Sequence, residues 1–286
     1  MSEPDNLFRP DPIVYLDQVA ASAPGRAYKR HALELLDLRP GHTVLDIGCG
    51  PGTDLAAMAA AVTPNGRVIG VDRDPAMIAE ARVRSAGRPL VDVRPGGIHA
   101  LPLDDGSVDR ACTDGVLQHA ADPSRVLEEF RRVARPGGRI VMAEPDWDGL
   151  LIDSPDPAIS RGLTRLITTE IVRNATIGRS LARLCLEAGL SVRSVVTAAP
   201  VFQDFDTADQ LFGLRRNVAR AIDAGHLDGG AREWIEEAGS QPFLATALAD
   251  PVRRYMLPVF RVGSGVLDEA EAAESACATP KWRPMP

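Results

Sequence analysis

Residues 43–52 read TVLDIGCGPG, an apolar run that leads into three closely spaced glycines. The aliphatic and β-branched residues of the run are typical of a buried strand in a parallel sheet. Glycines after such a strand allow a ligand to approach the backbone, and they adopt φ values that other residues resist. The stretch therefore predicts a buried strand, a ligand-binding turn and a helix that begins near Thr53.

The spacing of these glycines narrows the class of ligand. Dinucleotide sites use the pattern G-x-G-x-x-G. Here the glycines stand at 48, 50 and 52, and Thr53 takes the place of the third glycine of that pattern. A pyrophosphate cradle, and with it a nicotinamide-dependent oxidoreductase, is therefore disfavoured.

A second apolar run, residues 68–72, reads VIGVD and ends in a carboxylate. A carboxylate at the tip of the second strand can accept hydrogen bonds from both ribose hydroxyls of an adenosyl group. Capping of the next helix is the competing interpretation, but it suits Asp74 better, because Asp74 directly precedes Pro75. Asp72 is therefore predicted to contact the ligand.

The sequence on both sides of these runs predicts an α/β fold. Short apolar runs alternate with amphipathic stretches, which is the pattern of β-α-β units in a parallel sheet. The strands are expected at residues 43–48, 67–72, 90–94, 108–113 and 139–144, with a helix over 122–135. Further on, the pattern predicts mostly helix over 155–188, a strand over 191–198, helices over 206–249 and a last strand over 253–262. Ahead of the sheet, residues 12–38 predict two short helices interrupted at residues 23–25.

Composition excludes several classes of protein. Of 286 residues, 45% are hydrophobic and 25% charged, as in ordinary globular proteins. The formal net charge of −7 disfavours nucleic acid as a partner. The chain has neither an apolar run long enough to span a membrane nor a secretory signal, so we expect a cytoplasmic protein without a membrane partner. The four cysteines are widely spread and suggest neither disulfides nor zinc.

Four blocks of sequence, in order, resemble the class I S-adenosylmethionine-dependent methyltransferase family, especially the branch that modifies quinones and natural products. The blocks are residues 44–52 (VLDIGCGPG), 70–72 (GVD), 100–109 (ALPLDDGSVD) and 135–138 (RPGG). The resemblance implies a Rossmann-like sheet of seven strands, the last antiparallel, with cofactor and acceptor over the carboxyl ends of the strands. It also implies transfer of a methyl group to a small molecule, with S-adenosylhomocysteine as the second product.

The resemblance assigns the cofactor contacts position by position. The loop that starts at Asp46 and contains Gly48, Gly50 and Gly52 would line the methionine end, and Asp72 would hold the ribose. The remaining contacts would be Arg73 and Met77 beside the adenine, and Thr113 and Asp114 at the methionine portion. The family usually carries an Asp where this chain has Gly97, so backbone groups at Ile98 or the side chain of His99 would have to replace it at the adenine amino group.

Methyl transfer from a sulfonium is an in-line displacement, in which the protein chiefly aligns the two reacting atoms. A hydroxyl acceptor benefits from a general base, and histidine has a suitable pKa. His119, after the fourth strand, is the first candidate, and Glu144, after the fifth, is another. A histidine that packs or caps the next helix is an equally good interpretation of His119. No metal is expected, because the spacing of Asp114, Glu144, Asp146 and Asp148 does not match a metal-dependent site.

The additions to the core are expected to select the acceptor. The expected units are residues 1–40 as N-terminal cap helices, 41–147 as the cofactor-binding core, 148–262 as the rest of the core, and 263–286 as a tail. Helical insertions at 148–175 and 206–249 would complete the cap over a mostly apolar pocket for a small molecule. The chain would work as a monomer or a homodimer. A cofactor-binding protein without methyl transfer stays open as the alternative, because binding and transfer are separable.

Overall fold

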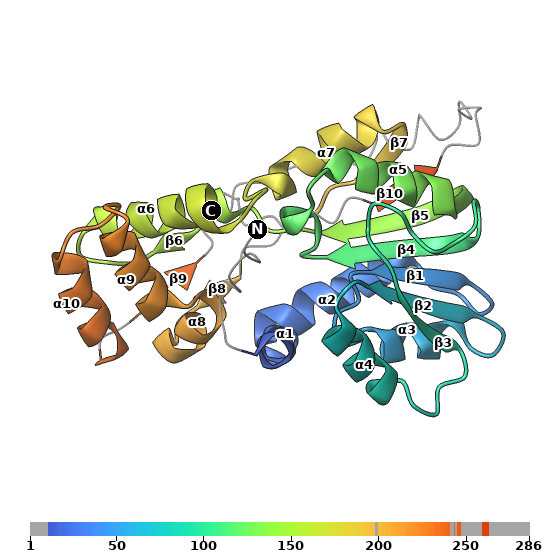
Figure 1. The fold of residues 1–286 in the computed structure, drawn as a ribbon, viewed down its shortest axis with the longest axis horizontal. Coiled ribbons are helices and arrows are strands. Elements are labelled where there is room, and N and C mark those ends of the chain that lie inside the picture. Colours follow the sequence, from blue (N-terminus) through green and yellow to red (C-terminus); the bar gives the residue numbers. More distant parts are fainter. Residues whose placement is uncertain (1–10, 198–199, 241–242, 244, 247–258, 263–286) are drawn as a thin grey trace, which may run out of the picture.

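The computed structural model describes residues 11–197, 200–240, 243, 245–246 and 259–262. Its centre is a parallel sheet in the order β3 (Val91–Pro95), β2 (Arg67–Asp72), β1 (Thr43–Ile47), β4 (Val108–Asp114) and β5 (Ala134–Ala143). After β1 the chain adds β2 and then β3 on one side. It then returns to the other side of β1 and adds β4 and β5, so the direction of strand order reverses between β1 and β4. Ligands of open α/β sheets bind at such a reversal. The predicted Rossmann-like α/β fold is confirmed (Figure 1).

Two further strands continue the sheet beyond β5. β10 (Val259–Val262) pairs antiparallel with β5 and with β7 (Leu190–Ser194). The strand predicted over 191–198 thus begins one residue earlier and ends at Ser194. Of the strand predicted over 253–262, residues 253–258 lie outside the described residues.

The sheet is covered by helices on both faces, because its residues alternate between two apolar cores. Leu45, Ile47 and Met142 face α5 (Pro123–Val133) and α7 (Ile177–Glu187). Val44, Val68 and Val141 face the other helices. These helices are α2 (Ala23–Leu36), α3 (Leu55–Val62) and α4 (Pro75–Arg84), and Figure 1 shows α3 and α4 below the sheet and α5 and α7 above it.

The N-terminal helices are α1 (Pro12–Ala21) and α2, and they meet at Ser22. The predicted interruption at residues 23–25 is wrong, because these residues form the first turn of α2. Ser22 caps this turn by accepting the Gly25 N–H at 3.0 Å, and proline is compatible with a first helical turn. The Arg84 guanidinium of α4 connects α1 to the core, because it donates two hydrogen bonds to the Asp17 carboxylate, at 2.6 and 2.8 Å.

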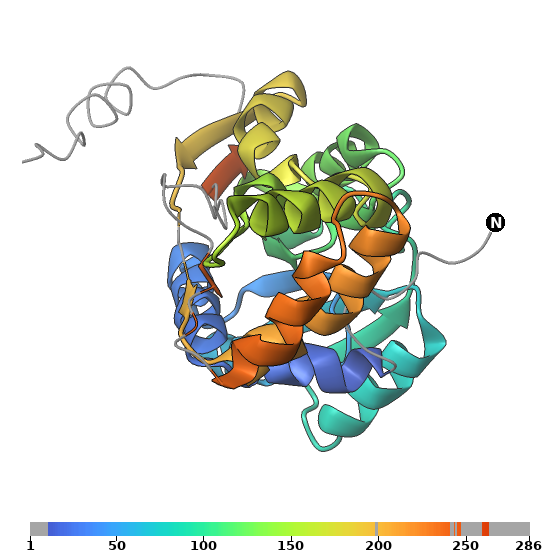
Figure 2. The ribbon, with the colours of Figure 1, turned by 90° about the vertical axis from the view of Figure 1, so that its left-hand side faces the viewer.

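A second lobe stands beside the carboxyl ends of the strands and has its own apolar core (Figures 1 and 2). It comprises α6 (Pro157–Leu166), α8 (Phe205–Phe212), α9 (Leu214–Asp223), α10 (Gly230–Glu237) and a small sheet of β6 (Leu151–Ile152), β9 (Ala245–Thr246) and β8 (Val201–Phe202). The helical prediction for 206–249 is wrong at Ala245–Thr246, because these two residues form β9 and pair with β6 and β8. Residues 247–249 lie outside the described residues. The helix predicted over 155–188 is broken between the π-helical turn Ile167–Ile171 and α7.

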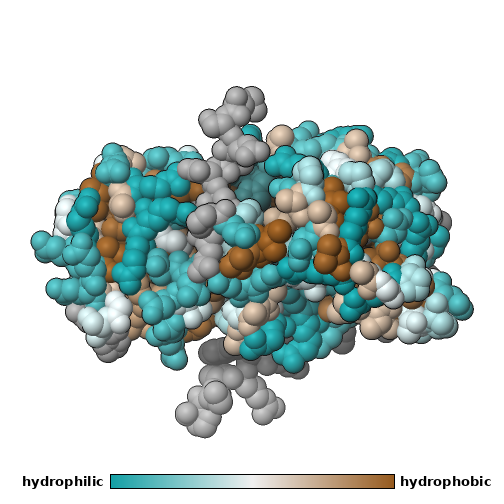
Figure 3. All heavy atoms as spheres, turned by 60° about the horizontal axis from the view of Figure 1, so that its bottom comes forward, coloured by the Kyte–Doolittle hydropathy of each residue, from teal (hydrophilic) through white to brown (hydrophobic). Residues whose placement is uncertain are grey.

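The surface mixes residue types. On the face in Figure 3, hydrophobic residues form small groups separated by hydrophilic ones. In the part of the chain that the structure describes, no helix has the length and apolar character needed to cross a membrane.

Candidate active site

The turn after β1 adopts a conformation that depends on its glycines. Gly48, Gly50 and Gly52 all have positive φ, at 68, 53 and 82°. A Cβ on Gly50 would also lie 3.2 Å from Cδ1 of Leu16, on the α1 helix that covers the turn. Side chains other than glycine's are strained at such φ values, so the sequence is matched to the turn.

Asp72 ends β2 beside this turn and holds it in place. Its Oδ2 accepts the Gly50 N–H at 2.9 Å, and its Oδ1 accepts the Asp74 N–H at 2.9 Å. Each carboxylate oxygen can accept a further hydrogen bond, so the capacity to bind two hydroxyls remains. Asp74 caps α4 by accepting the N–H groups of Ala76 and Met77, as its position before Pro75 predicts.

The residues expected around the adenine lie along one edge. Arg73 is exposed at the end of β2, and Met77 is buried in α4. Gly97 forms an isolated antiparallel β-bridge with Ala100. A Cβ added to Gly97 would have no atom of the described structure within 4 Å. His99 is half-buried, and its Nε2 accepts the Asp122 N–H at 3.2 Å, which leaves the proton on Nδ1. The contacts predicted for Ile98 and His99 stay predictions.

Two side chains end β4 at the other side of the turn. Thr113 is buried, and within the described structure its Oγ1 has no hydrogen-bond partner. Asp114 accepts hydrogen bonds from the Tyr28 hydroxyl at 2.9 Å and from Lys29 Nζ at 2.8 Å. A buried hydroxyl without a partner is costly, so Thr113 fits a polar group of a ligand at this position.

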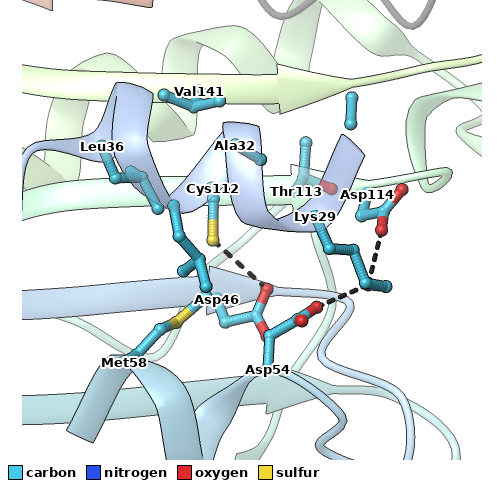
Figure 4. Close-up of a pocket in the computed structure, with 12 residues that line it drawn as sticks. Lys29, Ala32, Leu36, Asp46, Asp54, Met58, Cys112, Thr113, Asp114 and Val141 are labelled. Atoms are coloured by element: carbon cyan, nitrogen blue, oxygen red, sulfur yellow. Dashed lines mark hydrogen bonds and ion pairs between the residues drawn. The ribbon is translucent and has the colours of Figure 1, made fainter. Parts of the chain in front are cut away.

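Lys29 belongs to α2 and was not predicted as a site residue. Its ammonium lies between two carboxylates, 2.5 Å from Asp54 and 2.8 Å from Asp114 (Figure 4). Burial alone would lower the pKa of Lys29, but Asp114 and Asp54 outweigh it and hold this pKa above its ordinary value. The lysine shares a helical stripe with Ala32, Leu33 and Leu36, and a charged residue in an apolar stripe is the signal that could have revealed it.

Asp46 lies in the floor of the same pocket, at the end of β1. Burial, reinforced by the charge of Asp54, raises the pKa of Asp46 to about 7. Its Oδ1 is 3.5 Å from Cys112 Sγ, so the thiol donates to the carboxylate from the neighbouring strand. Asp46 thus lies beneath the glycine turn, and its predicted cofactor contact stays a prediction.

The two candidate bases are connected through one short turn, Leu117–His119. The Glu144 side chain is fully buried, and its carboxylate accepts the N–H groups of Val116, Leu117 and Gln118 at 2.9, 2.8 and 3.1 Å. His119 ends this turn and is exposed. Although part of the residue reaches the surface, protein atoms around the ring keep water from it, and this desolvation, followed by the charge of Arg73, lowers the pKa of His119 below its ordinary value, so the neutral ring predominates at pH 7. The geometry gives Glu144 a supporting position and His119 an accessible one.

The other carboxylates near this edge have separate partners. Asp146 is buried and accepts from Arg179 at 2.7 Å, and Asp148 lies 3.1 Å from the same guanidinium. Across the described residues, no three His, Cys, Asp or Glu side chains are placed to hold a metal ion.

The second lobe is joined to this edge through the turn that carries His119. Trp147 donates its indole N–H to Gln118 Oε1 at 2.7 Å. The side-chain amide of Asn174 donates to the carbonyls of Leu117 and Ala120, both at 2.8 Å. The lobe's apolar core is thereby held next to the site.

The residues at this edge fit an adenosyl amino acid. The free acceptor capacity of Asp72 suits ribose hydroxyls. The Thr113 hydroxyl, which has no partner among the described residues, suits a polar group, and the carboxylates around Lys29 suit a cationic end.

Comparison with known proteins identifies a matching family model, related sequences and similar solved structures. A family model described as a methyltransferase domain matches residues 38–182. An uncharacterized 37.1 kDa protein in a transposon of Streptomyces fradiae is 53% identical over 237 residues, which are 82% of this chain and 69% of that protein. A demethylmenaquinone methyltransferase of Bacillus cytotoxicus is 32% identical over 121 residues, so the match spans 42% of this chain and about half, 51%, of that enzyme. A crystal structure of a SAM-dependent methyltransferase from Aquifex aeolicus matches 67% of this chain and 93% of its own, at 24% identity and a TM-score of 0.51.

Proposed function

Since the chain belongs to the S-adenosylmethionine-dependent methyltransferase family, we propose that it transfers the donor's methyl group to a small, partly apolar molecule. The observation that carries the proposal is the glycine turn tied to Asp72, at the reversal of the sheet and beside an apolar lobe. The donor supplies an electrophilic methyl group on a sulfonium. The protein's task is to hold the acceptor in line with it.

The residues of the site divide this task. The glycine turn and Asp72 bind the ribose and methionine end, Thr113 and Asp114 face the methionine portion, and Arg73 and Met77 flank the adenine. His119 is neutral at pH 7, so it takes the proton of a hydroxyl acceptor. Glu144 positions His119 by anchoring the three backbone N–H groups that precede it.

The acceptor binds between the sheet edge and the second lobe. Support comes from the lobe's apolar core and from its attachment to the His119 turn through Trp147 and Asn174. Pockets for small molecules are mostly apolar and carry a few placed polar groups. The Bacillus cytotoxicus relative is, by its name, a methyltransferase that acts on demethylmenaquinone. The net charge of −7 is a further reason to favour a small molecule over nucleic acid.

The finer features of the family fold belong to the same proposal. The pairing of β10 with β5 and β7 supports a sheet of seven strands with an antiparallel last strand. We propose a monomer or homodimer, with residues 41–147 as the cofactor-binding core.

The test is incubation with a donor that carries a labelled methyl group, together with a panel of hydroquinones and other phenolic metabolites. Label is expected in the small-molecule fraction, identified by mass spectrometry. Label in added DNA, RNA or protein would contradict the proposal. Binding of the donor without any methylated product across the panel would favour the alternative of a binding protein.

A further inference from the structure

Lys29 is a cation placed among carboxylates of three different elements. Asp46 is the last residue but one of β1, Asp54 precedes α3, and Asp114 ends β4. All three line one pocket with Lys29, and among the described residues that line it Lys29 is the single cation (Figure 4). The pocket thus holds more acidic than basic groups.

The ammonium of Lys29 is largely withdrawn from water, with 16% of its side chain exposed. Its partners Asp54 and Asp114 are 22% and 30% exposed. Charges at such sites are screened less than surface charges and act over longer distances. A change of one unit charge in this cluster therefore alters the electrostatic energy of other charged groups near it, including those of a bound ligand.

The cluster adjoins the part of the site that receives the methionine end of the donor under the proposed function, on which this inference rests. Asp54 follows the glycine turn closely, and Asp114 is one of the residues expected to face the methionine portion. The donor carries a positive sulfonium, whereas the sulfur of S-adenosylhomocysteine is neutral. The charge of the cluster consequently acts on donor and product to different extents.

We propose that Lys29 sets the discrimination between donor and product by neutralising part of the negative charge of Asp54 and Asp114. The lysine keeps the site from holding the cationic donor too tightly relative to the neutral-sulfur product. Lys29 is a positioning and charge-balancing residue and makes no bond to the reacting atoms.

The test is isothermal titration of wild type and variants with S-adenosylmethionine and S-adenosylhomocysteine at low salt. If a unit charge of the cluster lies on the order of 10 Å from the sulfonium, at an effective dielectric constant of about 20, its removal changes the binding constant of the donor roughly tenfold. Lys29→Met should therefore raise the ratio of donor affinity to product affinity by about that factor, and Lys29→Arg should leave it unchanged. Asp54→Asn, which removes one negative charge, should lower the ratio.

The double variant Lys29→Met with Asp54→Asn restores the charge balance and should return the ratio towards wild type. A purely structural role of Lys29 would weaken both ligands together and leave the ratio constant. A constant ratio in folded Lys29→Met overturns the proposal. If that variant does not fold, a constant ratio in Asp54→Asn overturns it instead. Wild type that binds neither ligand would contradict the proposed function, which separates the two failures.

Discussion

The backbone N–H of Gly50 donates to Oδ2 of Asp72 at 2.9 Å, and this bond joins the turn after β1 to the end of β2. The residue expected to hold the ribose therefore also fixes the turn expected to hold the methionine end. If both expectations hold, one carboxylate couples the two halves of the expected cofactor site.

Asp72→Ala should weaken binding of S-adenosylhomocysteine by about 1.5–3 kcal/mol, the range for hydrogen bonds to a charged group. Asp74→Ala is the matched control, because Asp74 caps α4 and has no predicted contact with the cofactor. The control should lose about 1 kcal/mol of stability and keep its affinity. Equal losses of affinity in the two variants, measured by titration calorimetry, would show that Asp72 has no special role.

Gly50→Ala should lower both stability and cofactor affinity. The positive φ of 53° costs about 1–2 kcal/mol for a residue with a Cβ, and the added methyl would press on Leu16. Gly137→Ala is the control, since Gly137 has φ of 77° but no atom of the described structure within 4 Å of the added Cβ. Urea unfolding should show a cost in both variants, and titration should show weaker binding in Gly50→Ala alone. Unchanged binding there would contradict the placement of the cofactor against this turn.

The part of this site that lies on the strands could be predicted from sequence, because strand, glycine turn and carboxylate are contiguous in the chain. Residues 43–52 and Asp72 carry the signal within short windows, and the register of β1 with β2 brings them together. Lys29 could not be placed in this way. Its partners Asp54 and Asp114 lie far along the chain, and a lysine on a helix usually indicates a solvated face.

The second lobe shows another limit of sequence patterns. Its strands β6, β8 and β9 have two residues each, too short for any alternation to be visible. They form only because residues distant in the chain supply the pairing partners. Similarly, residues 23–25 contain the proline and glycine typical of a break, yet Ser22 supplies a cap that makes them a helix start.

His119→Ala should reduce turnover strongly while cofactor affinity stays the same, because His119 faces the acceptor side under the proposed function. The surroundings and Arg73 lower the pKa of His119 below its ordinary 6.5, so activity should fall only as pH drops below this value. Arg73→Gln should move this acidic limb to higher pH. His31→Ala is the control, since His31 is half-buried on α2, pairs with Glu34 and has no predicted role in the site. Normal steady-state turnover in His119→Ala would assign this histidine to helix packing.

Glu144→Gln should destabilise the fold by about 1–3 kcal/mol, because the NH2 of the new amide would face backbone N–H groups, such as that of Gln118, whose hydrogen bonds the carboxyl oxygens now accept. Burial raises the pKa of Glu144 from 4.5 to about 8, despite the three N–H donors that favour the charged form. Between these two pH values the folded state keeps a proton that the unfolded state has lost. The contribution of Glu144 to the free energy of unfolding is therefore fully present below about pH 4.5 and is lost as pH rises to about 8.

The stability gap between wild type and Glu144→Gln should therefore narrow between these pH values in urea unfolding. A gap that widens with pH would contradict the raised pKa. Loss of turnover with full stability would instead identify Glu144 as a base in direct contact with the acceptor.

Titration of the wild-type protein with S-adenosylhomocysteine, and separately with NAD, tests the central claim most directly. The glycine turn at 48, 50 and 52 and the carboxylate of Asp72 predict saturable binding of S-adenosylhomocysteine, one molecule per chain, and no binding of NAD. Binding of NAD without binding of S-adenosylhomocysteine would contradict the account.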